Sequence, residues 1–254
     1  METDKKKYKT IIFDLFNTVA LWDKRKLPRF TWLGEEKIST LGSLKILLEK
    51  KAPLASFDNF YRSFYETSLA IENDRNQNSK EVSSQERFER VLHGCGMDCC
   101  KKTRTLANSL STEHMKLLAK SCVIPEKHRA TIEALSLSYR LGIVSNFDHA
   151  QTARSILSHG DVDQHFSHIV ISEEFGWRKP NHLIFEHALG LLNSDPLNTL
   201  HVGDSLQDDV IGAQNIKLDV AWVNAPNNEN HNDTIKPTYE ILSIVDLERM
   251  LPPN

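Results

Sequence analysis

The sequence lacks a long apolar run. Behind the basic amino terminus, the first apolar run covers only residues 11–13, and no later stretch approaches the roughly 20 residues that a membrane-spanning helix needs. The amino terminus also lacks the longer apolar segment of a signal peptide. We therefore expect a soluble, cytoplasmic protein that has no membrane partner.

Cysteine is also scarce, with four residues at positions 95, 99, 100 and 122. The adjacent pair at 99 and 100 fits none of the usual spacings of zinc ligands, and no histidine pair follows at a suitable distance. The histidines are scattered, and His201, inside an apolar run, is expected to be a hydrogen-bonded core residue rather than a ligand. We predict reduced thiols that bind no metal.

A large excess of one charge is absent as well. The chain has 31 Lys and Arg residues against 34 Asp and Glu residues, which gives a formal net charge of −3. Binding to nucleic acid over a broad surface depends on a strongly basic surface. Nucleic acid is therefore not an expected partner.

Five short apolar runs are present instead, and helix-forming stretches separate them. Their near-continuous apolar character is typical of parallel strands that are buried on both faces of a sheet. With 254 residues, of which 40% are hydrophobic, the chain can bury a sizeable core. We predict an α/β fold with a doubly wound parallel sheet, whose strands cover residues 10–13, 141–144, 168–171, 199–202 and 220–223.

Roughly 125 residues separate the first two apolar runs, which is far more than one crossover helix needs. Apolar residues recur in this insert at helical spacing, whereas the polar residues 72–84 are expected to form an exposed connection. We predict that the insert is helical throughout and forms a domain of residues 22–121 between two core segments, residues 1–21 and 122–254. The helical patterns cover residues 38–48, 57–71, 87–92 and 106–118.

Polar residues stand at the carboxyl ends of the predicted strands or shortly after them. Asp14 follows the first strand, Ser145 the second and Asp204 the fourth, while Lys179 lies shortly beyond the third. Ligands of open parallel sheets bind in the crevice outside these strand ends. The sequence therefore predicts that the four side chains form one site.

Four segments of the chain resemble, in order, the four motifs of the haloacid dehalogenase superfamily of hydrolases. The resemblance implies a Rossmann-like core, and it implies that the α-helical insert is a cap that closes over the site. A closing cap would exclude water and contact the substrate. The segments are IIFDLFNT at residues 11–18, IVSNFD at 143–148, RKP at 178–180 followed by Ile184 and Phe185, and HVGDS at 201–205 followed by Asp208, Asp209, Gly212 and Ala213.

The resemblance also implies a role for each motif residue. Asp14 would be the nucleophile, and Asp14, Asp204 and the backbone carbonyl of Phe16 would bind Mg²⁺, which prefers oxygen ligands. Thr18 would help to orient the first loop. The phosphate-binding residues would be Thr18, Ser145, Asn146 and Lys179, and the supporting residues would be Asp209, Asp208 and Arg178.

The supporting residues allow alternatives. The spacing of five residues after Asp204 favours Asp209 as a carboxylate that orients Lys179. An acidic first turn of the following helix is the other interpretation for Asp208. Arg178 and its neighbour Trp177 either face the substrate or cover the loop.

The residue types suit phosphoryl transfer. A carboxylate that attacks a phosphate dianion brings like charges together, and both Lys179 and a cation would offset the repulsion. We predict a Mg²⁺-dependent hydrolase that acts on a small phosphorylated metabolite through an aspartyl-phosphate intermediate at Asp14. The sequence names neither the metabolite nor the oligomeric state.

Phe16 departs from the superfamily pattern. Phosphatases of the superfamily usually have a second aspartate at this position, which transfers protons, and its loss would cost about 10²–10⁴ in rate. Substrates with good leaving groups, such as acyl or aryl phosphates, would suffer less. Asn17 stands where glycine is common, although asparagine tolerates unusual backbone angles.

Phe16 also keeps two other functions open. A metal-independent 2-haloacid dehalogenase needs no proton donor, because a halide leaves unprotonated, but such enzymes replace the acidic pair of the last motif, and Asp204 is present here. The second alternative is a protein that binds a phosphorylated ligand without turning it over.

Overall fold

The structure is a computed structural model that describes residues 8–52, 55–225 and 234–251. The basic amino terminus lies outside these residues. The backbone divides into two compact units, which are Met1–Trp22 with Val123–Asn254, here called the core unit, and Asp23–Cys122, here called the helical unit. The assignment of residues 22–121 to a cap domain stays a prediction. Within the described ranges, no helix combines the length and the apolar character needed to cross a membrane.

The described part of the core unit contains a six-stranded sheet in the order β10-β9-β8-β1-β6-β7, in which all neighbours are parallel. The central strands β1 and β8 are buried at every residue, because helices cover both faces of the sheet. The predicted doubly wound α/β fold is confirmed, with one strand, β10, that was not predicted. The strands are β1 Thr10–Phe13, β6 Arg140–Ser145, β7 Phe166–Ile171, β8 Thr199–Gly203, β9 Asp219–Val223 and β10 Tyr239–Ile241.

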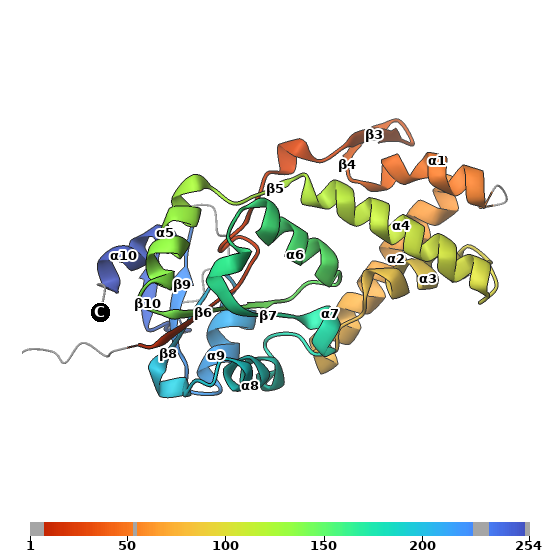
Figure 1. The fold of residues 1–254 in the computed structure, drawn as a ribbon. Helices are drawn as coiled ribbons and strands as arrows, with labels where there is room; N and C mark the ends of the chain where they lie inside the picture. The colour runs from red at the N-terminus through yellow and green to blue at the C-terminus, as the bar shows by residue number, and fades with distance from the viewer. Residues whose placement is uncertain (1–7, 53–54, 226–233, 252–254) are drawn as a thin grey trace, which may run out of the picture. The chain divides into compact units, whose positions relative to one another are not determined.

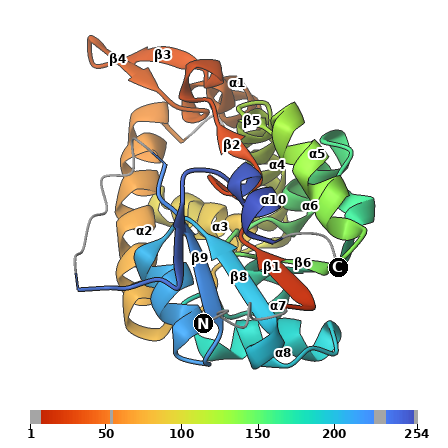
Figure 2. The ribbon, with the colours of Figure 1, turned by 90° about the vertical axis from the view of Figure 1, so that its left-hand side faces the viewer.

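Helices lie on both sides of this sheet, with α8 and α9 on one side and α5, α6 and α10 on the other (Figure 1, Figure 2). On the first side, Ile184 and Phe185 of α8 share a buried cluster with Ile12 of β1 and Val144 of β6. The helices are α5 Glu126–Ser136, α6 Ala150–His159, α7 Ser172–Phe175, α8 His182–Leu191, α9 Gly212–Gln214 and α10 Leu247–Met250. Shorter turns are η2 Asp163–His165, η3 Pro196–Asn198, η5 Ile244–Asp246 and the π-helix η4 Leu206–Ile211.

The helical unit holds four helices and one hairpin in its described residues. Phe60 of α2, Phe88 of α3 and Leu106 of α4 share its buried core. Its elements are the turn η1 Lys24–Lys26, strands β3 Arg29–Trp32 and β4 Glu35–Ile38, and helices α1 Leu41–Lys51, α2 Phe57–Asn78, α3 Ser84–Gly94 and α4 Lys101–Ala119. Two further short strands, β2 Leu21–Trp22 and β5 Cys122–Val123, pair with each other.

Two predictions for the insert were wrong. Residues 29–38 form the antiparallel hairpin β3–β4 and not a helix, because Leu33 (φ 51°) and Gly34 (φ 82°) make a tight turn with positive φ angles. Residues 72–78 continue α2 and are not a connection, since no glycine or proline interrupts them. The helix ends where Ser79 adopts a left-handed conformation.

Candidate active site

The carboxyl ends of β1, β6 and β8 bring the predicted site residues to one edge of the sheet. Phe13 of β1 lies opposite Ile143 of β6 and Val202 of β8. Asp14 directly follows β1, and its backbone N–H donates to the carbonyl of Val202 at 2.8 Å. The parallel register therefore places Asp14 beside the ends of β6 and β8, where Ser145 and Asp204 stand.

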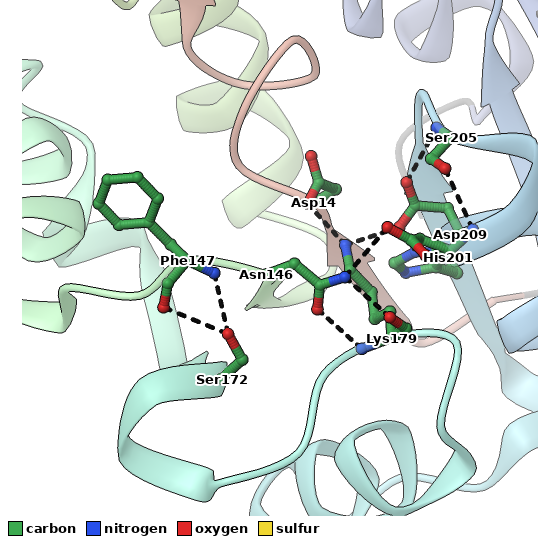
Figure 3. A network of polar contacts seen from close by, with 9 residues as sticks. Asp14, Asn146, Phe147, Ser172, Lys179, His201, Ser205 and Asp209 are labelled. Atoms are coloured by element: carbon green, nitrogen blue, oxygen red, sulfur yellow. Dashed lines mark hydrogen bonds and ion pairs between the residues drawn. The ribbon is translucent and has the colours of Figure 1, made fainter. Parts of the chain in front are cut away.

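Lys179 is the centre of the polar network (Figure 3). Its Nζ donates to Asp14 Oδ1 at 2.6 Å and to Asp209 Oδ1 at 2.7 Å, and the residue is only 2% exposed. A buried ammonium is stable only when it is paired in this way. Motifs that are far apart in the sequence are thus joined through one side chain.

The amide of Asn146 fixes the backbone of the lysine loop. Asn146 Nδ2 donates to the Lys179 carbonyl at 2.9 Å, and Asn146 Oδ1 accepts from the Lys179 N–H at 2.7 Å. Nδ2 also donates to Asp208 Oδ2 at 3.1 Å. The Asn146 side chain therefore holds Lys179 in place, and its predicted contact with phosphate remains a prediction.

Asp209 receives hydrogen bonds on both carboxylate oxygens. Its Oδ1 accepts from Lys179 and, at 2.8 Å, from His201 Nε2, while its Oδ2 accepts from the backbone N–H of Ser205 at 3.0 Å. A β-carbon at Gly203 would lie 2.2 Å from Asp209 Cγ, so glycine is required for this close approach. The predicted support of Lys179 by Asp209 agrees with this geometry.

The π-helix η4 explains why two adjacent aspartates face different partners. Ser205 caps it by accepting from the N–H of Asp208 at 3.1 Å, so that Asp208 lies in an acidic first turn. Its carboxylate reaches Asn146, and burial raises its pKa, while Arg178 acts in the opposite direction. Arg178 thus lies near Asp208, and its contact with a substrate remains a prediction.

Burial sets the electrostatics of the carboxylates. Burial, together with the charges of Asp209 and Asp204, raises the pKa of Asp14 to about 8 against the influence of Lys179. Burial and the charge of Asp209 likewise raise the pKa of Asp204 to about 6. Burial would also raise the pKa of Asp209, but Lys179 and His201 hold it far below its ordinary value. The single positive charge of Lys179 therefore does not offset burial and the neighbouring carboxylates at Asp14 and Asp204.

This carboxylate cluster fits a divalent cation. Asp14, Asp204 and Asp209 each offer one carboxylate oxygen, and these atoms lie within 4.8 Å of one another. Mg²⁺ prefers oxygen ligands from carboxylates. A cation would also add positive charge to that of Lys179 beside Asp14 and Asp204. The sequence predicted Asp14 and Asp204 as ligands and Asp209 as a support, and the geometry makes Asp209 a third candidate ligand.

Two buried hydroxyl groups of the predicted site, one at the end of β6 and one in the loop after β1, have no partner in the described part of the chain. They are Ser145 Oγ and Thr18 Oγ1, in residues that are 0% and 1% exposed. Most buried hydroxyls in folded proteins are hydrogen-bonded. Two unpaired hydroxyls therefore suggest groups that are kept available for a bound ligand.

The sequence did not assign two polar residues, Asn17 and His201, to the site, although the predicted hydrogen-bonded core position of His201 is confirmed. Asn17 has a φ of 59°, and its side chain forms a hydrogen bond with Asp204 that lowers the pKa of that carboxyl against burial. His201 is 0% exposed and must donate to Asp209, since an ionised carboxylate can only accept. Two features of the sequence could have indicated these residues. Asn17 is an asparagine in a tight loop, and His201 is an ionisable residue in an apolar strand.

Comparisons with known proteins agree with this geometry. The family model described as haloacid dehalogenase-like hydrolase matches residues 49–223. The pyrimidine 5'-nucleotidase YjjG of Escherichia coli (strain K12) is 30% identical over 163 residues, which are 63% of this chain and 71% of that protein.

Two solved structures share the fold. The 2-haloacid dehalogenase from Pseudomonas syringae pv. Tomato DC3000 has a TM-score of 0.73 at 21% identity, covering 96% of this chain and 98% of that one. YfnB from Bacillus subtilis, in a crystal structure bound to magnesium, has a TM-score of 0.62 at 21% identity, covering 97% and 100%. The match to the family model, which spans more than half of the sequence, shows that the chain belongs to the haloacid dehalogenase-like hydrolase family.

Proposed function

We propose that the protein is a Mg²⁺-dependent phosphatase that acts on a small phosphorylated metabolite. The observation that carries this proposal is the position of Asp14, which Lys179 holds at 2.6 Å beside the strand ends that carry two unpaired, buried hydroxyls. An oxyanion needs both a cation and hydrogen-bond donors, and this edge of the sheet supplies both. The relative YjjG, a nucleotidase, supports phosphoryl chemistry.

Asp14 is the nucleophile in this proposal. One of its carboxylate oxygens forms a bond to phosphorus while the bond from phosphorus to the leaving-group oxygen breaks, and the electron pair departs with that oxygen. Water then cleaves the aspartyl-phosphate, which releases inorganic phosphate and restores Asp14. The hydroxyls of Ser145 and Thr18 would donate to the phosphoryl oxygens, and Lys179 would stay protonated throughout.

The cation would be held by Asp14, Asp204 and the backbone carbonyl of Phe16, with Asp209 as a further candidate. Bound Mg²⁺ would supply positive charge that offsets the repulsion between Asp14 and the phosphate. Since burial raises the pKa of Asp14 to about 8, the charge of a cation would also favour the ionised nucleophile at neutral pH.

Phe16 determines which phosphates react well. Its side chain can neither give a proton to a leaving group nor take one from water. Alkyl phosphates, which leave as basic alkoxides, are expected to react about 10²–10⁴ times more slowly than with an acid at this position. Acyl phosphates and nitrophenyl phosphate, which leave as weakly basic anions, are expected to react faster.

Dehalogenation is the second candidate, and Phe16 is the observation that favours it. Attack of Asp14 on the carbon of a 2-haloacid would expel a halide, which needs no proton. The cluster of Asp14, Asp204 and Asp209 argues against it, because three carboxylates around one lysine repel an anionic substrate unless a cation is bound. Metal dependence therefore separates the two functions.

A substrate panel tests the proposal. Acetyl phosphate, p-nitrophenyl phosphate, a nucleoside monophosphate and 2-chloropropionate are incubated with the protein, with Mg²⁺ or with a chelator, and phosphate and chloride release are measured. We expect Mg²⁺-dependent phosphate release that Asp14→Asn abolishes. Chloride release in chelator would establish the dehalogenase, and tight phosphate binding without any turnover would establish the binding protein.

A further inference from the structure

Three aromatic side chains of the core unit pack against one another, and two of them belong to the motifs of Asp14 and Ser145. Phe16 follows Asp14 by two positions, and Phe147 follows Ser145 by two positions. The ring of Phe16 stacks on Trp22 at a centroid distance of 5.0 Å and an interplanar angle of 15°, and lies 4.5 Å from the ring of Phe147. The three rings form one apolar surface at the ends of β1 and β6, which we call the aromatic wall.

The aromatic wall is not part of the buried core. Leu15 and Val19, in the same loop as Phe16, are both 0% exposed and do the packing there, whereas all three wall residues are only half-buried. Figure 3 shows the ring of Phe147 turned away from the polar network around Lys179. Part of each of these side chains is therefore accessible to another molecule.

The polar side chains of Lys179 and Asn146 are already hydrogen-bonded within the protein and do not make the aromatic wall polar. Lys179 Nζ is bonded to Asp14 and Asp209, and the Asn146 amide is bonded to the lysine loop and Asp208. With the hydroxyls of Ser145 and Thr18 engaged by the phosphoryl group, a sugar or polyol placed against the rings would lose hydrogen bonds to water and gain few in return. A flat, apolar group would lose little and would gain contact with aromatic rings.

We propose that the aromatic wall receives the leaving group and selects phosphates of aryl or aroyl groups. Two properties of the wall give the same substrate class. Phe16 supplies no proton, so the leaving group must depart as a weakly basic anion. The rings favour a flat, apolar leaving group, and nitrophenolate and aromatic carboxylates have both properties. This assignment rests on the proposed phosphatase function and excludes nucleotides and sugar phosphates as good substrates.

Benzoyl phosphate and acetyl phosphate test the assignment directly. Both release a carboxylate of similar basicity, so chemistry alone predicts similar rates, and only the benzoyl group carries a ring. With Mg²⁺ present, we expect kcat/KM for benzoyl phosphate to exceed that for acetyl phosphate by about 10-fold or more, from contacts with two or three rings.

Variants of the wall identify the contacts. Trp22→Leu and Phe147→Leu keep apolar bulk but remove a ring, and each is expected to lower the ratio of kcat/KM for benzoyl phosphate to that for acetyl phosphate by about 2–10-fold. Phe175→Leu is the matched control, because Phe175 stacks on His187 at 4.5 Å, outside the wall. This control should leave the preference unchanged.

Binding of non-hydrolysable phosphonates tests the same preference even if turnover is slow. Phenylphosphonate and methylphosphonate differ only in the ring, and inhibition or calorimetry gives their affinities for the Mg²⁺-loaded protein and its variants. Tighter binding of phenylphosphonate that weakens in Trp22→Leu and Phe147→Leu supports the assignment. Equal affinities overturn it.

The two proposals fail in different ways. If acetyl and benzoyl phosphate are hydrolysed equally well by a process that needs Asp14, the aromatic selection is wrong and the phosphatase function stands. If no phosphate in either set is hydrolysed and neither phosphonate binds, both proposals are wrong.

Discussion

The two sides of the candidate active site differ in the groups that they offer for catalysis. On the polar side, Lys179, Asp209 and His201 are buried and bonded to one another, and Lys179 orients Asp14. On the aromatic side, Phe16 and Phe147 are half-buried and have no group that transfers a proton. Nucleophilic attack and release of the leaving group are therefore separable steps. A site can supply every group for the attack while the release depends on a leaving group that needs no proton.

The largest effect is expected from removing the positive charge of Lys179, which lies at the centre of the polar side. Lys179→Met leaves Asp14 and Asp209 buried without a positive partner, which typically costs about 3–5 kcal/mol of stability. Loss of this charge at the reacting phosphate should also lower kcat by about 10²–10³-fold. Thermal unfolding and phosphatase kinetics measure the two effects.

A double variant separates folding from chemistry on this side. Lys179→Met with Asp209→Asn removes both members of the buried pair, so most of the lost stability should return while the activity stays low. Recovery of activity in the double variant would show that Lys179 serves only to neutralise Asp209.

A proton donor on the aromatic side should make alkyl phosphates better substrates. Phe16→Asp is expected to raise turnover of an alkyl phosphate such as glycerol 2-phosphate by about 10–100-fold, less than the full value of a general acid because the new carboxyl lies between two rings. Phe16→Asn has the same shape without an acid and is the matched control. An equal gain in both variants would mean that the ring merely blocks the site.

Much of the core unit was predictable, because its strands are continuous apolar runs between helices and three of the five predicted runs are followed within two residues by a site residue. β10 was missed, since its three residues lie at the sheet edge and only Ile241 is buried. The hairpin β3–β4 was missed for a related reason. In β3, exposed residues alternate with half-buried ones over only four residues, which is short enough to be taken for part of a helical pattern.

The candidate site shows a similar limit. Asp14, Ser145 and Asp204 could be named because each stands at a strand end within a recognisable motif, and Lys179 because its motif follows shortly after the third predicted strand. Asn17 and His201 could not, since their roles depend on where a loop and a strand bring their side chains relative to Asp204 and Asp209. Likewise, the sequence showed that Phe16 lacks an acid, but only the fold shows that Trp22 and Phe147 surround it.

His201 tests how far the polar side extends. His201→Leu removes one of the two donors to Asp209 Oδ1, so Asp209 should hold Lys179 less accurately, and kcat is expected to fall by about 10-fold with little change in KM. His201→Gln keeps an N–H donor and should recover part of this loss. A loss of stability in both variants without the difference in kcat would assign His201 to packing alone, for instance against Phe185.

The smallest effect concerns the stability of the metal-free protein. Folding raises the pKa of Asp204 to about 6, from about 4 in an unfolded chain, so the folded state binds more protons between these values and the free energy of unfolding falls as the pH rises through them. Above about pH 6, the ionised Asp204 destabilises the fold. At about pH 8 in chelator, Asp204→Asn should therefore raise Tm by roughly 2–8 °C, which corresponds to about 1–2 kcal/mol, and it should change little at about pH 4. Added Mg²⁺ should raise the Tm of the wild type more than that of the variant. Equal shifts at both pH values would show that Asp204 acts through hydrogen bonding and not through its charge.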